Sequence, residues 1–105
     1  MEEPINVFML GTAGCGKSTM VAAYADWMYR NQYSTILVNL DPGVQTLPYE
    51  PDVDVRDLFT LSEVMDDYSL GPNGAQIVAS DMLALNAKKL KEDIAAKEAH
   101  YIIYD

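Results

Sequence analysis

The residues best suited to chemistry form one short run near the N-terminus, which reads Gly11-Thr12-Ala13-Gly14-Cys15-Gly16-Lys17-Ser18. The run matches the Walker A pattern, in which a lysine and a hydroxyl residue follow the last glycine. Glycines let the backbone curl so that successive N–H groups point at phosphate oxygens. Lys17 then reaches the terminal phosphates, and the Ser18 hydroxyl is an oxygen ligand for Mg²⁺. We therefore predict a nucleoside-triphosphate site over residues 11–18 with Thr19 beside it, the alternative being a strand-to-helix turn without a ligand.

Two acidic side chains, Asp41 and Asp105, each follow directly after a predicted strand. Ligands of open parallel sheets gather at the carboxyl ends of the strands, so both acids should face the same rim as the phosphate loop. A carboxylate there can hold Mg²⁺, directly or through water, or orient an attacking water. We predict that both acids join Ser18 in a metal site. The alternatives are turn chemistry for Asp41, which begins an Asp-Pro-Gly turn, and a chain end that happens to be acidic for Asp105.

Apolar runs predict the strands that position these residues. Three stand out, at residues 5–10, 35–40 and 101–104. Each is short and nearly continuous, as expected of a parallel strand buried on both faces. The first run leads into the glycines, and an acid follows each of the other two.

Helical patterns separate these runs. A helix is predicted from Lys17 to about Asn31, and its positive end faces the phosphate loop. Capping-box spacing over residues 60–63 predicts the start of another helix, and residues 75–98 read as one long helix because apolar residues recur with helical spacing. Residues 53–59 are predicted as a short helix. Strands alternating with helices indicate an α/β fold with a parallel sheet and right-handed crossovers.

Composition restricts the class of protein and its partners. The chain has 105 residues, enough for one small domain, and a formal net charge of −9. An acidic chain without a basic stripe argues against binding to nucleic acid or an anionic membrane. The single cysteine excludes a disulfide within the chain and fits a reducing compartment. Because the N-terminus lacks the basic region of a secretory signal, we expect a cytoplasmic protein.

The tripeptide Gly71-Pro72-Asn73 lies between two predicted helices. Alone it is a turn. Together with the phosphate loop, however, it resembles the GPN-loop GTPase family. Three more stretches are similar to segments of that family, namely Val38 to Pro42, Tyr49 to Asp57, and Tyr101 to Asp105. Only the Asp of the family's Asp-Thr-Pro-Gly motif is present, as Asp105.

The resemblance implies a fold, an activity and partners. The fold would be a three-layer α/β/α P-loop NTPase domain related to signal-recognition and MinD-like NTPases. Residues 1–105 would be its N-terminal portion, with about three strands and an exposed sheet edge. The full protein would bind GTP or GDP with Mg²⁺ and hydrolyse GTP as a homodimer. Residues 71–73 would belong to the site, with Asn73 reaching the partner's phosphates, and RNA polymerase assembly partners are implied. Lys17, Asp41 and Asp105 would complete the catalytic set.

Two alternative functions remain open at this point. One is a nucleotide-gated binding or assembly module in which turnover is incidental. The other is an ATP-using P-loop enzyme, such as a MinD-like ATPase or a small-molecule kinase. The guanine-reading Asn-Lys-x-Asp motif, which would separate the last alternative from a GTPase, does not occur in this chain.

Three further residues could do chemistry, and each has a simpler structural explanation. Cys15 fills a small-residue position in the phosphate loop, and His100 lies at a helix-to-strand junction. Arg56 could act as an arginine finger, but neighbouring Asp54 and Asp57 favour a structural ion pair.

Overall fold

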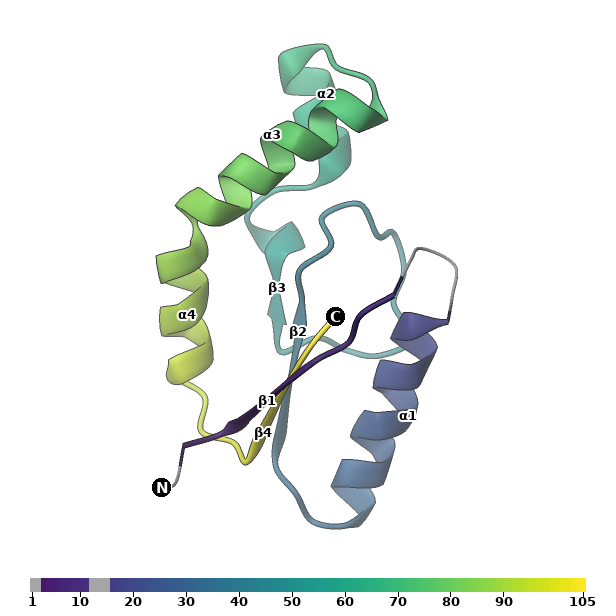
Figure 1. Ribbon diagram of the computed structural model, residues 1–105, viewed down its shortest axis with the longest axis vertical. Helices are drawn as coiled ribbons and strands as arrows, with labels where there is room; N and C mark the ends of the chain where they lie inside the picture. Colours follow the sequence, from purple (N-terminus) through teal and green to yellow (C-terminus); the bar gives the residue numbers. More distant parts are fainter. Residues whose placement is uncertain (1–2, 12–15) are drawn as a thin grey trace.

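The structure is a computed structural model, and it describes residues 3–11 and 16–105. Its centre is a parallel sheet with the strand order β1-β4-β2-β3 (Figure 1). The strands are β1 (Ile5–Phe8), β2 (Thr35–Asn39), β3 (Val53–Asp54) and β4 (Tyr101–Tyr104). The parallel sheet predicted from the alternation of strands and helices is therefore confirmed.

Successive side chains of a strand point to opposite faces of the sheet, so the buried strands present apolar side chains on both faces. Helices cover both of these faces. On one face, Leu37 and Ile103 pack against Val21 of α1 (Lys17–Arg30). On the other face, residues of β2, β3 and β4 pack against α4 (Ala87–Ala95), chiefly Ile36, Val38, Val53, Ile102, Leu90 and Ile94. The resulting layers are those of an α/β/α fold (Figure 1).

The strand β1 differs from its prediction as a buried strand. Among the described strands it pairs only with β4, and Ile5 and Phe8 are 55% and 61% exposed. The apolar run was interpreted correctly as a parallel strand, but apolar content does not reveal whether a second strand lies alongside. The Phe8 ring instead stacks on Tyr104, with 4.5 Å between ring centroids. The expectation of an exposed sheet edge is confirmed.

Residues 53–59 were predicted as a short helix, which is wrong in its first part. Val53 and Asp54 form β3, in register with Val38 and Asn39, so the described residues contain four strands rather than about three. A 3-10 turn follows over Val55–Asp57. A strand of two residues is too short to show an alternating pattern, so its pairing with β2 decides the conformation.

The predicted long helix over residues 75–98 is also wrong, because Asn86 divides it. The structure has α3 (Pro72–Leu85) and α4 (Ala87–Ala95), which run in different directions (Figure 1). The Asn86 backbone leaves helical geometry at φ −98° and ψ 4°, and its side-chain Nδ2 donates to the Met82 carbonyl at 2.8 Å. Asparagine commonly caps a helix in this way because its amide competes for backbone partners.

The break lets the two halves pack on different cores. Leu90 and Ile94 of α4 face the sheet. Ala75 and Ala79 of α3 pack instead with Val64 of α2 (Leu61–Tyr68) and with Phe59. The helix start predicted from the capping-box spacing is confirmed, since Thr60 is the N-cap of α2 and Glu63 N donates to Thr60 Oγ1 at 3.2 Å.

Within the part of the chain that the structure describes, no helix combines the length and the apolar character needed to cross a bilayer.

A polar network fixes the segment between β2 and β3. Arg56 Nη2 lies 2.7 Å from Asp54 Oδ2, and the guanidinium also donates to the carbonyls of Val44 and Gln45. Buried Asn39 donates to Asp54 Oδ1 at 2.9 Å. The predicted ion pair of Arg56 is therefore confirmed for Asp54, and the guanidinium is engaged within its own chain.

Asp54→Asn should make the protein less stable and less sensitive to acid. Burial pushes the pKa of Asp54 upward, but hydrogen bonds from Arg56 and Asn39 outweigh it and lower the pKa. The stabilisation is therefore fully present above the unfolded value of about 4 and is lost as the pH falls through the folded pKa. We expect a loss of about 1 to 2 kcal/mol at neutral pH, measured by chemical denaturation.

The matched control is Asp67→Asn, which removes an exposed carboxylate from α2. Below about pH 4, the unfolding free energy of Asp54→Asn should change less with pH than that of the parent. Equal slopes would show that the Asp54 network does not cause the acid sensitivity.

Candidate functional site

Three side chains, two from the start of α1 and one from the segment between β2 and β3, contact the carboxylate of Asp105. Ser18 Oγ donates to Asp105 Oδ2 at 2.9 Å, and the Tyr49 hydroxyl donates to the same oxygen at 2.7 Å. Lys17 Nζ lies 3.5 Å from Asp105 Oδ1. The Asp105 side chain is 3% exposed, so these partners satisfy a nearly buried charge. The structure thus brings together Lys17, Ser18 and Asp105, which the sequence analysis placed in one site.

The strand ends explain why Asp105 lies there. Its N–H donates to the Val38 carbonyl at 2.8 Å, and its carbonyl accepts from Leu40 N at 3.0 Å. The backbone of Asp105 is therefore held by β2 just beyond the end of β4. The side chain is left to point toward the start of α1, as expected at the carboxyl ends of parallel strands.

The start of α1 places Lys17 and Ser18 in the first helical turn. Gly16 is the N-cap, with φ 85° and ψ 17°, a left-handed conformation that favours glycine. Met20 N donates to the Gly16 carbonyl at 3.0 Å, which begins the helix. Thr19 is exposed beside this turn, and Gly11 is exposed after β1. The predicted binding residues Thr12, Ala13, Gly14 and Cys15 lie outside the described residues.

Tyr49 is the member of this cluster that sequence reasoning missed. It lies between β2 and β3, and its half-buried ring packs against the cluster formed by Val21, Leu37 and Ile103. Burial, followed by the hydrogen bond to Asp105, raises the pKa of Tyr49 well above its ordinary value. The hydroxyl therefore keeps its proton and stays a donor. The only available signal was its place in the stretch Tyr49 to Asp57, which said nothing about contact with Asp105.

Asp41 is not brought into this cluster. Its Oδ1 accepts from Gly43 N at 2.9 Å, which is the turn chemistry considered as an alternative. Its N–H donates to Asn39 Oδ1 at 3.1 Å. Among the described residues, no hydrogen bond or ion pair joins Asp41 to Lys17, Ser18 or Asp105. A metal role for Asp41 therefore stays a prediction.

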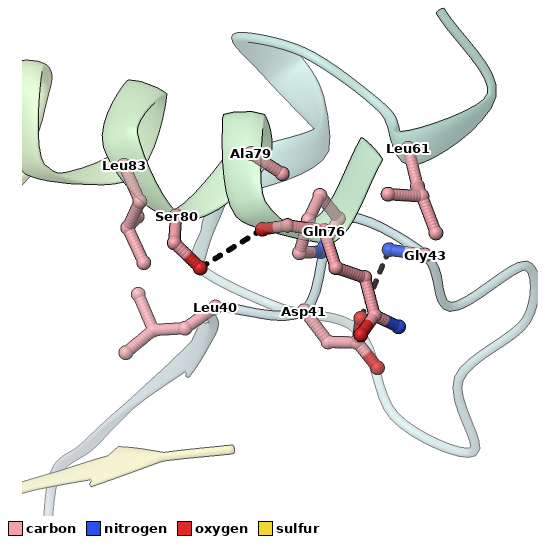
Figure 2. A pocket seen from close by; sticks show the side chains of 9 residues that line it. Leu40, Asp41, Gly43, Leu61, Gln76, Ala79, Ser80 and Leu83 are labelled. Atoms are coloured by element: carbon pink, nitrogen blue, oxygen red, sulfur yellow. Dashed lines mark hydrogen bonds between the residues drawn. The ribbon is translucent and has the colours of Figure 1, made fainter. Parts of the chain in front are cut away.

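Asp41 instead lines a separate pocket of about 370 Å³ between the turn after β2 and α3 (Figure 2). Figure 2 shows the Gln76 side chain extending from α3 toward the Asp41–Gly43 turn, while Leu40 and Leu83 form an apolar side. The pocket is thus lined by the Asp41 carboxylate on one side and by apolar side chains on the other.

The tripeptide Gly71-Pro72-Asn73 begins a helix rather than forming a loop of its own. Gly71 is the N-cap of α3, and Pro72 is its first residue. Proline suits this position because its fixed φ is helical and its missing N–H would have no partner there. Asn73 is exposed in the first turn. Figure 1 shows the starts of α3 and α1 well apart, so the structure does not bring Asn73 to the Asp105 cluster.

The donor types around Asp105 fit Mg²⁺ held together with phosphate. Among the described residues, no three or more His, Cys, Asp or Glu side chains gather as a metal site. A hydroxyl and one carboxylate are available instead, at Ser18 and Asp105. Mg²⁺ prefers oxygen ligands and keeps waters and substrate phosphates in its coordination shell, so it does not need an all-protein cage.

Comparison with known proteins identifies the family. Residues 9–105 match a family model described as a conserved hypothetical ATP binding protein. GPN-loop GTPase 1 of Dictyostelium discoideum is 36% identical over 106 residues, covering 99% of this chain and 27% of that protein. GPN-loop GTPase 3 of Aspergillus fumigatus is 39% identical over 100 residues, covering 94% and 34%. The chain belongs to the GPN-loop GTPase family.

The fold of this family member agrees with a solved structure. A crystal structure of a GTPase in apo form from Pyrococcus abyssi superposes with a TM-score of 0.85 at 38% identity. The match covers 97% of this chain and 41% of the other, which confirms the predicted P-loop α/β class. The chain spans about a third or less of the curated relatives described above. The family model's description mentions ATP, whereas the relatives are named GTPases.

Gly16→Ala should destabilise the protein more than Gly71→Ala. Both glycines are helix N-caps, and an added Cβ would meet no atom of the described residues within 4 Å at either position. They differ in backbone conformation, because Gly71 has φ −75° and Gly16 has φ 85°. The left-handed conformation costs a residue with a Cβ about 1 to 2 kcal/mol. We expect this difference in unfolding free energies from denaturant titration, and equal losses would show that Gly16 can leave its left-handed conformation freely.

Proposed function

We propose that the protein binds GTP with Mg²⁺ through residues 11–19 and hydrolyses it. The observation that carries the proposal is the convergence of Lys17, Ser18 and Asp105, with Ser18 Oγ 2.9 Å from the carboxylate. This arrangement places a cation, a hydroxyl and a buried carboxylate at the N-terminus of α1, where the helix dipole also favours an anion. Few other ligands would use all four features.

Each residue then has a defined part in the reaction. Lys17 exchanges its contact with Asp105 for the terminal phosphates and neutralises charge that develops there. Ser18 and Asp105 would hold Mg²⁺ through their oxygens, directly or through water, and the ion would supply positive charge to the phosphates. Asp41 is proposed to orient water from the neighbouring strand end.

A second subunit is proposed to supply Asn73. This side chain is exposed at the start of α3, away from the Asp105 cluster of its own chain. A neutral amide can donate to a phosphate oxygen and accept from a water at once, which suits the positioning of a nucleophile. A homodimer with facing sites would let Asn73 act across the interface and would exclude bulk water from the site while keeping the attacking water.

The guanine base is proposed from the relatives, which are named GTPases and include a structure of a GTPase. A competition of GTP, GDP and ATP for the Mg²⁺-loaded protein, followed with a fluorescent nucleotide, tests it. We expect GTP and GDP to displace the probe and ATP to fail at the same concentrations. An ATP preference would favour the ATP-using enzyme instead.

Loss of both phosphate-loop side chains should strongly weaken nucleotide binding. We expect Lys17→Ala with Ser18→Ala to weaken GTP binding by at least about a hundredfold, since the two charged hydrogen bonds each contribute on the order of 1.5 to 3 kcal/mol. Isothermal titration with Mg²⁺ measures the affinity, and a thermal melt checks that the variant is folded. Unchanged affinity in a folded variant would remove the basis of the proposal.

Asn73→Ala should lose hydrolysis yet keep GTP binding. If Asn73 acts from the partner subunit, mixing Asn73→Ala with Lys17→Ala protein should restore hydrolysis that neither has alone, because mixed dimers hold one complete site. Steady-state phosphate release measures it, with each variant alone as its control. Restoration would fail if Asn73 served its own subunit. An Asn73→Ala variant that still captured its assembly partners would favour the nucleotide-gated assembly module.

A further inference from the structure

We propose that Tyr49 is a positioning residue that holds the Asp105 carboxylate in place for the phosphate site. The inference rests on the proposed function of Asp105. Its basis is the 2.7 Å hydrogen bond from the Tyr49 hydroxyl to Asp105 Oδ2, made from a segment outside the phosphate loop.

The three partners of Asp105 are not equivalent. Lys17 and Ser18 belong to the phosphate loop, and a bound polyphosphate with its cation competes for both of them. Tyr49 lies between β2 and β3 and has no such competing partner in the proposed mechanism. When Lys17 and Ser18 turn toward the nucleotide, Tyr49 is therefore the partner that stays with the carboxylate.

The Tyr49 ring is itself held by its surroundings. It packs against the apolar cluster formed by Val21 of α1, Leu37 of β2 and Ile103 of β4, so the core between α1 and the sheet contributes to its position. Three residues further along the chain, Asp52 is tied to β2 by two hydrogen bonds with the backbone of Leu37, both of 2.8 Å. A donor held this firmly can fix one carboxylate oxygen in orientation.

Fixing Oδ2 has a consequence for Oδ1. The side chain of Asp105 cannot turn about its Cα–Cβ bond without breaking the contact with Tyr49, so the second oxygen stays directed at the phosphate loop. Preorganised ligands of this kind bind a cation more tightly because less ordering remains to be done on binding. Tyr49→Phe removes the hydroxyl and keeps the ring, which separates orientation from packing.

The experiment compares GTP binding by the parent and by Tyr49→Phe, with Mg²⁺ and with EDTA. We expect the strengthening of GTP binding by Mg²⁺ to shrink by about tenfold in the variant, with little change in EDTA. A purely structural effect of the substitution would weaken GTP binding equally with Mg²⁺ and with EDTA. Tyr29→Phe, whose residue is 82% exposed on α1, is the matched control and should behave as the parent does.

A double-mutant cycle tests whether Tyr49 acts through Asp105. In an Asp105→Asn background, Tyr49→Phe should have little further effect on the Mg²⁺ dependence, because the carboxylate that it orients is gone. If the losses of Mg²⁺ dependence from Tyr49→Phe and Asp105→Asn were additive, the inference about Tyr49 would be overturned. The same holds if Tyr49→Phe kept the parent's Mg²⁺ dependence. Either result would leave the proposed function standing. A parent that fails to bind GTP with Mg²⁺ would overturn the proposed function and, with it, this inference.

Discussion

The buried carboxylate of Asp105 is the constraint on which the site depends. A charge that is 3% exposed has to be compensated, and the chain compensates it with side chains from α1 and from the segment between β2 and β3. The backbone of the same residue is bonded to Val38 and Leu40. One residue therefore joins the register of the sheet to the start of α1, and the order of the strands determines the geometry of the site.

Much of this arrangement could be predicted from the sequence, because strong local signals specify it. Gly16, Lys17 and Ser18 belong to a motif whose spacing is dictated by phosphate geometry, and the strand-end position of Asp105 follows from the rule for parallel sheets. The start of α2 was similarly readable from Thr60 and Glu63. Each of these signals acts over a few residues, so a single sequence suffices to read it.

The features that were missed depend on contacts between distant residues. The position of β1 at the sheet edge and the two-residue strand β3 are set by which strands lie alongside. Tyr49 and Asp105 are 56 positions apart in the chain, and no local sequence pattern predicts the hydrogen bond between them. The helix end at Asn86 was not predicted, because apolar residues recur with helical spacing on either side of it.

The division at Asn86 has a consequence for local unfolding. The helices α2 and α3 pack with Val55 and Phe59 in one small apolar cluster, whereas α4 belongs to the cluster on the sheet, and only Leu58 and Leu83 of the described residues pack against both. Parts of a protein whose cores share few residues can open with separate free energies, which amide hydrogen exchange resolves. The helical hairpin that carries Gly71-Pro72-Asn73 is therefore expected to exchange its amide protons sooner than β2 and β4, as a cooperative unit that opens while the strands stay paired.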